Sequence, residues 1–141
     1  MSEDDRDGFR PATRTDPLSA DVRLRGRTYA IPFDRVWTAA CALADGGMPR
    51  WTLLLVDDEK GKIDAEATTL VLRLRDAVHV DVALDENGLT RVDVSVAPAR
   101  GWLDLGRGRR MVSRFVRRLD AGVHAGAGEI IDPTRMPSWS A

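Results

Sequence analysis

The sequence contains little cysteine, no long apolar run and almost no net charge. Its 141 residues include one cysteine, Cys41, which excludes an internal disulfide and a cysteine-based zinc site. No apolar run approaches the roughly 18 residues of a membrane span. The N-terminus is acidic, whereas a signal peptide begins with basic and then apolar residues. We therefore expect a soluble, cytoplasmic protein.

The net charge of −1 argues against nucleic acid as a partner, because binding to phosphates requires a basic surface. The charge is nevertheless uneven along the chain. Residues 1–21 hold six acids against three arginines, and residues 100–120 hold seven arginines against two acids. This distribution predicts either a basic segment that the chain's own acids neutralise or a docking face for an anionic partner.

The most regular stretch is an amphipathic, arginine-rich helix that follows a glycine-containing turn. Its apolar arc comprises Leu105, Gly108, Met111, Val112, Phe115, Val116 and Leu119. Its polar face carries Arg107, Arg109, Arg110, Arg114, Arg117 and Arg118. We expect Asp104 to be the N-cap, because its carboxylate can accept from the free N–H groups of the first turn, and Gly122 to end the helix.

The rest of the chain divides into one further helix, several strands and two tails. The predicted parts are a flexible acidic arm (1–20), a single α+β domain (21–122) and an extended C-terminal tail (123–141). Within the domain, residues 23–31 are typical of an edge strand. Residues 33–45 have the periodicity of an amphipathic helix that Gly46 and Gly47 end, and Cys41 lies near its apolar face as a small buried residue.

Alternating apolar residues indicate strands in the middle of the domain. The runs cover residues 51–56, 63–67, 70–74, 78–84 and 92–96. A three-residue loop with Gly88 in the left-handed conformation would pair Val80 with Val94 and Val82 with Val92, which keeps one face uniformly apolar. The order β-α-β-β-β-β-α predicts a two-layer α+β sandwich, with a mostly antiparallel sheet of about five strands and both helices on one face.

Several short segments carry a family resemblance. They are Pro-Phe-Asp-Arg-Val-Trp (32–37), Arg-Trp-Thr-Leu (50–53), Lys-Ile-Asp-Ala-Glu-Ala (62–67), Asp-Ala-Val-His-Val (76–80), Arg-Val-Asp-Val-Ser (91–95), and Gly101 with Asp-Leu-Gly (104–106) ahead of the last helix. From residue 29 to residue 119 this succession resembles the bacterial family catalogued as domain of unknown function 1499. The resemblance implies a fold and an order of elements but no chemistry. The chain is more loosely similar to helix-grip, START-like domains, which implies an apolar ligand between sheet and helices.

The predicted register gathers candidate catalytic residues on the outer face of the sheet. His79 lies beside Ser95 and Asp81 beside Asp93, with Arg73 and Arg91 near them. A histidine, a serine and paired carboxylates are typical of a hydrolytic or metal site, yet no further metal ligand converges there. An ordinary solvated sheet face carries the same mixture of charges. Both readings stay open, and His124 in the tail belongs to neither.

The arginine-rich helix offers two further surfaces. The segment Gly106-Arg107-Gly108-Arg109 at its start is compatible with a phosphate site or with a tight turn that lets the helix approach the sheet. The arginine face (Arg107, Arg109, Arg110, Arg114, Arg117 and Arg118) is compatible with an acidic protein, an anionic membrane surface, or a solvated face balanced by acids of the same chain. In the tail, Trp139 could fill a groove or have no role.

These observations favour a non-enzymatic binding or accessory module without cofactor or metal. Its contact surface would be a cleft between helices and sheet or the arginine face. The alternative is a carrier of the helix-grip type, with a lipid-like ligand near Trp37, Trp51, Leu72, Val80, Val94 and Phe115. A carrier needs an apolar cavity of about 300 Å3 or more. A hydrolase or metal site on the outer sheet face is the third hypothesis. The partner and oligomeric state are unknown.

Overall fold

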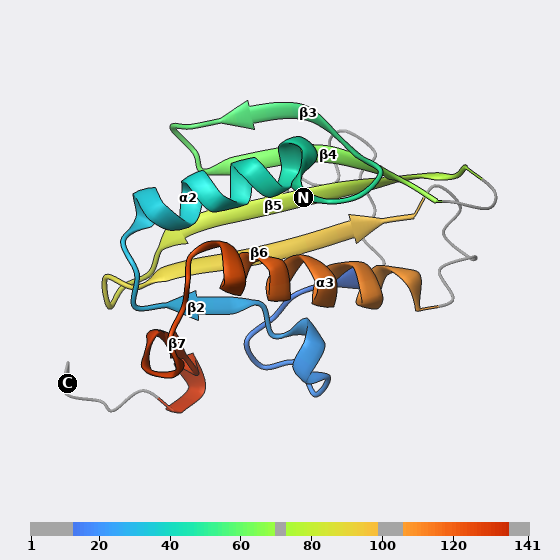
Figure 1. The fold of residues 1–141 in the computed structure, drawn as a ribbon. Helices are drawn as coiled ribbons and strands as arrows, with labels where there is room; N and C mark the ends of the chain where they lie inside the picture. The colour runs from blue at the N-terminus through green and yellow to red at the C-terminus, as the bar shows by residue number, and fades with distance from the viewer. Residues whose placement is uncertain (1–12, 70–72, 99–105, 136–141) are drawn as a thin grey trace.

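In the computed structural model, an antiparallel sheet carries two helices on one face (Figure 1). The model describes residues 13–69, 73–98 and 106–135. The strands are β1 (Thr13–Arg14), β2 (Arg27–Tyr29), β3 (Trp51–Asp57), β4 (Lys62–Thr68), β5 (Arg75–Leu84), β6 (Thr90–Ala97) and β7 (Ile130–Ile131). The helices are α2 (Phe33–Ala42) and α3 (Arg107–Gly122), with shorter turns η1 (Val22–Leu24), η2 (Leu43–Gly47), η4 (Ala127–Glu129) and η5 (Pro133–Arg135). The predicted α+β sandwich is confirmed.

The sheet has the order β3-β4-β5-β6-β2-β7, and β1 pairs with β6 as well. The register of β5 and β6 places Val80 opposite Val94 and Val82 opposite Val92, as predicted. Gly88 has φ 77° in the connecting loop, a conformation that glycine adopts without a steric penalty. The glycine loop therefore sets which side chains face the helices.

The core lies between the helices and the apolar sheet face. Buried side chains come from α3 (Val112, Phe115, Val116 and Leu119) and from α2 (Val36 and Ala40). The ring of Trp51 in β3 stacks on Phe115, with centroids 5.5 Å apart and an angle of 2° between the planes. Full burial of a large apolar side chain stabilises a fold by about 1.5–3 kcal/mol. The apolar arc of α3 is therefore its main attachment to the sheet.

Two carboxylates fix the ends of α3. The Asp76 side chain, 1% exposed, accepts from the Arg107 guanidinium at 2.7 and 2.8 Å. At the other end, Asp120 accepts from the Tyr29 hydroxyl at 2.6 Å and from Arg27 Nε at 3.0 Å. Burial raises the pKa of Tyr29, and its hydrogen bond to the Asp120 carboxylate raises it further. The polar contacts thus set the axial position of α3 over the sheet.

Both predicted tails contribute to the sheet where the structure describes them. Residues 1–20 were expected to form a flexible arm, but β1 pairs with β6 and Thr15 N–H donates to the Val94 carbonyl at 2.9 Å. Residues 1–12 lie outside the described residues. In the predicted C-terminal tail, β7 pairs with β2, so β2 is not the edge strand expected at residues 23–31. These pairings join segments far apart in sequence, so local composition does not reveal them.

Residues 73 and 74 do not belong to the strand predicted at 70–74. Thr69 N–H donates to the Leu74 carbonyl at 2.8 Å, and Leu74 N–H donates to Thr69 Oγ1 at 2.8 Å. These bonds close a loop, and β4 pairs directly with β5. Residues 70–72, including Leu72, lie outside the described residues. The strand prediction is therefore wrong for residues 73 and 74 and stays untested for residues 70–72.

The helix ends agree with the predictions only in part. The first helix changes at Leu43 to a wider turn, in which Gly46 has φ 105°. The N-cap of α3 is Gly106, without a side-chain capping bond, so the predicted cap Asp104, outside the described residues, is wrong. At the other end, α3 ends at Gly122 as predicted, and the left-handed residue is His124 (φ 53°) beyond it. The N–H of His124 donates to the Ala121 carbonyl at 3.1 Å, which closes the last turn.

Candidate functional site

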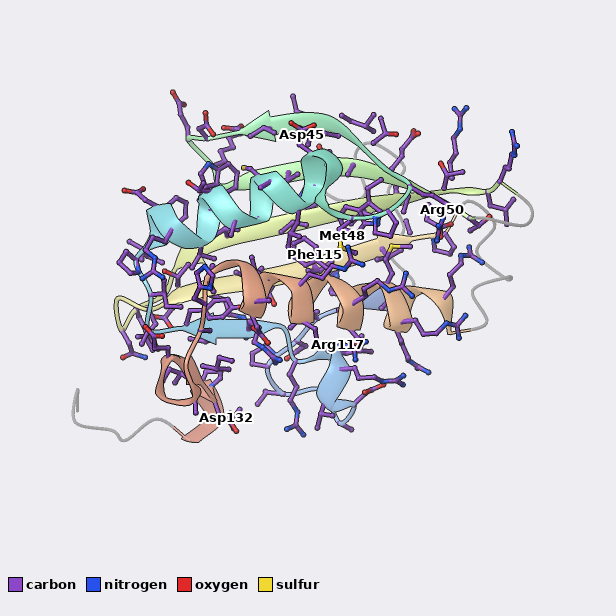
Figure 2. All side chains as sticks on the ribbon, in the orientation of Figure 1. Asp45, Met48, Arg50, Phe115, Arg117 and Asp132 are labelled. Carbon is purple, nitrogen blue, oxygen red and sulfur yellow. The ribbon has the colours of Figure 1, made fainter. Side chains whose placement is uncertain are left out.

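A pocket of about 200 Å3 opens between the N-terminal half of α3 and the corner where β3 begins and β4 ends. We call it the arginine pocket. Its lining consists of Met48, Pro49, Arg50, Trp51, Ala67, Thr68, Thr69, Arg107, Arg110, Met111 and Arg114. In Figure 2, Met48 lies beside Phe115 above α3, and Arg50 lies towards the N-terminal end of that helix. The sequence analysis did not identify this site as a whole.

The floor of the arginine pocket is apolar. Met48, Trp51 and Ala67 are each less than one tenth exposed, and Met111 of α3 is half-buried. The Trp51 ring is held by its stacking on Phe115. Methionine side chains adapt to the shape of a neighbouring apolar group because they are unbranched and polarizable. The floor can therefore accommodate short apolar groups of different shapes.

Arginines form the rim, and none of the lining residues is acidic. The guanidinium of Arg107 is neutralised by the buried Asp76 carboxylate. Arg50 and Arg114 are exposed, and within residues 13–69, 73–98 and 106–135 neither has an ion-pair partner. Guanidinium groups bind carboxylates and phosphates with two parallel hydrogen bonds. The rim thus matches an anionic group.

The start of α3 has an unusual distribution of charge. Its first turn contains no acidic residue and its N-cap has no side-chain bond. Arg107, Arg109 and Arg110 instead place positive charge at the positive end of the helix dipole, where acids are favourable. Such a conflict between local preference and fold is expected at functional sites. The Asp76 carboxylate beside Arg107 and the Asp21 carboxylate beside Arg109 offset part of this charge.

Arg50 adds a strained backbone to the same site. Its φ of 62° is left-handed, which disfavours a residue with a Cβ by about 1–2 kcal/mol. The conformation lets its carbonyl accept from Thr68 N–H at 2.9 Å, across the end of the β3–β4 pair. Backbone strain that the surroundings maintain is often found at binding sites. Arg50 therefore lies at the rim in a backbone conformation that lowers the stability of the fold.

The six arginines predicted as one face on α3 have different surroundings. Arg107, Arg110 and Arg114 line the arginine pocket. Arg109 lies 3.7 Å from the Asp21 carboxylate, and Arg118 donates to the Gly47 carbonyl at 2.8 Å. Arg117 lies on the opposite side of α3 from Met48 and Arg50 (Figure 2). Arg107, Arg109 and Arg118 therefore contact other parts of the chain, and Arg107, Arg110 and Arg114 line the pocket.

The outer-face cluster has the predicted register, with His79 opposite Ser95 and Asp81 opposite Asp93. Its charges are mutually neutralised. Lys62 lies 3.7 Å from Asp81, and the Arg91 guanidinium lies 2.7 Å from Asp93, which also accepts from a threonine hydroxyl. The surface has the arrangement of a solvated ionic network.

The same geometry does not favour a hydrolase. A serine nucleophile needs a histidine nitrogen as its base. His79 Nδ1 bonds to the Asp64 carboxylate, which the sequence analysis missed, and its Nε2 faces Asp81 Oδ1 at 3.8 Å. Among the described residues, no group of three or more His, Cys, Asp or Glu side chains is placed to hold a metal ion.

The residues proposed for an interior carrier site mostly belong to the packed core. Val80, Val94 and Phe115 are at most 1% exposed. Trp37 is half-buried and donates from Nε1 to Asp58 Oδ1 at 3.0 Å, and Leu72 lies outside the described residues. Of the five that the structure describes, only Trp51 lines the arginine pocket.

A second pocket, of about 240 Å3, lies between η1, β2 and β7. Its three arginines are already bound within the chain. Arg27 binds Asp120, Arg91 binds Asp93, and Arg25 donates to the Ser19 carbonyl at 2.8 Å. This pocket therefore offers less unsatisfied charge than the arginine pocket.

The remaining candidates are isolated. Cys41 is partly buried, and burial raises the pKa of its thiol, which makes it a poor nucleophile. His124 closes the last turn of α3 through its backbone N–H, and Trp139 lies outside the described residues. In the described ranges, neither α2 nor α3 has the length and apolarity of a membrane span.

Comparisons with known proteins assign no family. The chain matches no protein-family model, and no curated protein sequence matches it. The resemblance to the family catalogued as domain of unknown function 1499, and the looser one to helix-grip domains, therefore stay predictions from the residues quoted above.

Proposed function

We propose that this protein is a non-enzymatic binding module that holds a small anionic ligand with a short apolar body in the arginine pocket. The observation that carries this proposal is the combination of an apolar floor with a rim of arginines and, among the described lining residues, no acid. The ligand's carboxylate or phosphate would lie between Arg50 and Arg114. Its apolar body would lie against Trp51 and Met111.

The size of the pocket limits the ligand. The arginine pocket has a volume of about 200 Å3. A ligand the size of octanoate or phenyl phosphate meets this limit. A drug-sized or lipid-sized ligand needs about 300 Å3 or more. The volume, together with the packed valines of β5 and β6, favours the binding module over the lipid carrier.

Octanoate is the probe that tests this proposal, in calorimetric titrations of the full chain. Octylammonium has the same apolar body with the opposite charge, and acetate has the same charge without the body. We expect octanoate to bind measurably more tightly than either control. Equal affinities for octanoate and octylammonium would show that the arginine rim does not recognise the ligand's charge.

The matched variants are Arg114→Gln and Arg117→Gln. Both residues are exposed arginines of α3, and only Arg114 lines the pocket. A hydrogen bond to a charged group contributes about 1.5–3 kcal/mol, so Arg114→Gln is expected to raise the dissociation constant for octanoate about tenfold or more. Arg117→Gln should leave it unchanged. An equal effect of both variants would contradict the assigned site.

A further inference from the structure

β3 is an open edge of the sheet. It stands first in the strand order, and in the part of the chain that the structure describes it pairs with β4 alone. It is seven residues long, whereas the opposite edge, β7, has two. The free N–H and C=O groups along such an edge form a template for another strand. A long edge of this kind needs either protection or a partner.

β3 has little protection of the usual kind. Proteins block exposed edges with charged residues or proline, and Trp51 to Val56 contain neither. Leu54 and Leu55 are 56% and 60% exposed. The strand does contain a bulge between Leu53 and Leu55, which shifts the alternation by one residue. The edge is therefore apolar and accessible along most of its length.

We infer that β3 pairs antiparallel with β3 of a second copy of this chain, so that two sheets join into one. The strand itself fits this arrangement. Antiparallel pairing with Leu53 opposite Leu54 of the partner subunit aligns the two copies along the whole length of β3. Parallel pairing in register would bring the two Asp57 side chains together on the outer face, and like charges directly opposite disfavour it.

The faces of the strand agree with this register. Opposite residues in a sheet must point to the same face. Pairing with β4 puts Trp51 and Val56 on the helix face, and Thr52 and Leu55 on the outer face. The inferred register places Trp51 opposite Val56 and Thr52 opposite Leu55. These pairs share a face because the bulge between Leu53 and Leu55 adds one residue, which shifts the alternation in the second half of β3.

Sedimentation velocity of the full chain over a micromolar concentration series tests the dimer. The matched variants are Leu55→Lys and Leu84→Lys, because both leucines are 60% exposed and only Leu55 lies in β3. We expect the parent chain to dimerise and Leu55→Lys to raise the dimer dissociation constant about tenfold or more. Leu84→Lys should dimerise like the parent. A monomeric parent, or equal dimerisation of both variants, overturns the inference.

Oxidative cross-linking tests the register itself. In a Cys41→Ala background, the combined substitutions Thr52→Cys and Leu55→Cys should give a disulfide-linked dimer, because each cysteine faces the other type in the partner subunit. Either substitution alone should give little covalent dimer. Equal cross-linking of a single variant, or none in the double variant, overturns this register. If β3 instead pairs with a strand of a different protein, the purified parent is monomeric and the inference fails.

Discussion

Replacing Arg50 with glycine tests whether the arginine pocket is maintained at a cost in stability. The left-handed φ of 62° disfavours arginine by about 1–2 kcal/mol, while glycine adopts it freely. Glycine also increases the entropy of the unfolded chain, which offsets roughly half of that gain. The Arg50 side chain has no ion-pair partner within the described residues, and its carbonyl bond to Thr68 is retained. We expect a net stabilisation of about 0.5–1 kcal/mol.

The same substitution should weaken binding. At the size of this chain, about 1 kcal/mol raises the melting temperature by about 2–4 °C, which circular dichroism can follow. Loss of one guanidinium from the rim should raise the dissociation constant for octanoate about tenfold. The variant would then be more stable and less able to bind, as expected when a functional residue is strained.

His124→Gly is the matched control. His124 is also left-handed, with φ 53°, but it ends α3 and does not line the pocket. It should gain similar stability with unchanged octanoate affinity. The reasoning would be refuted if Arg50→Gly melted below the parent while His124→Gly melted above it, or if Arg50→Gly bound octanoate as tightly as the parent.

Two further predictions concern the attachments of α3. Asp76→Asn should destabilise the fold by about 2–4 kcal/mol, because Arg107 loses its buried counter-charge. Urea unfolding measures this change. An unchanged free energy of unfolding would show that the pair does not stabilise the fold. Tyr29 is the only tyrosine, and its pKa is raised from the ordinary 10.0 by burial and by the bond to Asp120. Its stabilising contribution is therefore complete below pH 10 and decreases as the pH rises further, because only the unfolded chain ionises there. Tyrosinate absorbance should appear together with unfolding, and earlier ionisation in folded protein would refute the buried environment.

Periodicity was sufficient to predict the main layers of this fold. The apolar arc of α3 identified its buried face, and Gly88 identified the register of β5 with β6. The strand predicted at 70–74 does not include residues 73 and 74, because Leu74 N–H donates to the Thr69 side chain instead of to a neighbouring strand. β1 and β7 were missed because two-residue strands depend on distant partners rather than on their own composition.

The candidate site was less accessible to sequence reasoning. Arginines 107, 110 and 114 were named, but only packing brings Arg50 beside them. The sequence did contain a signal that Asp76 is buried. Asp76 lies two residues before Val78 in β5, so its side chain points to the same, buried face of the sheet. The same alternation, carried across the β4–β5 pair, would have placed Asp64 opposite His79. Contacts within the meander were therefore predictable, and contacts between layers were not.

The sheet topology also separates the contacts that can form early in folding from those that form late. The pairs β3–β4, β4–β5 and β5–β6 join neighbours in sequence, so each closes a short loop with a small loss of chain entropy. Thr15 reaches β6 across 79 positions, and β2 meets β7 only after most of the chain has been made. A nascent chain can thus form its central meander while β7 is not yet available. The β2–β7 edge of the sheet would be completed last, which makes that edge the first place for local opening.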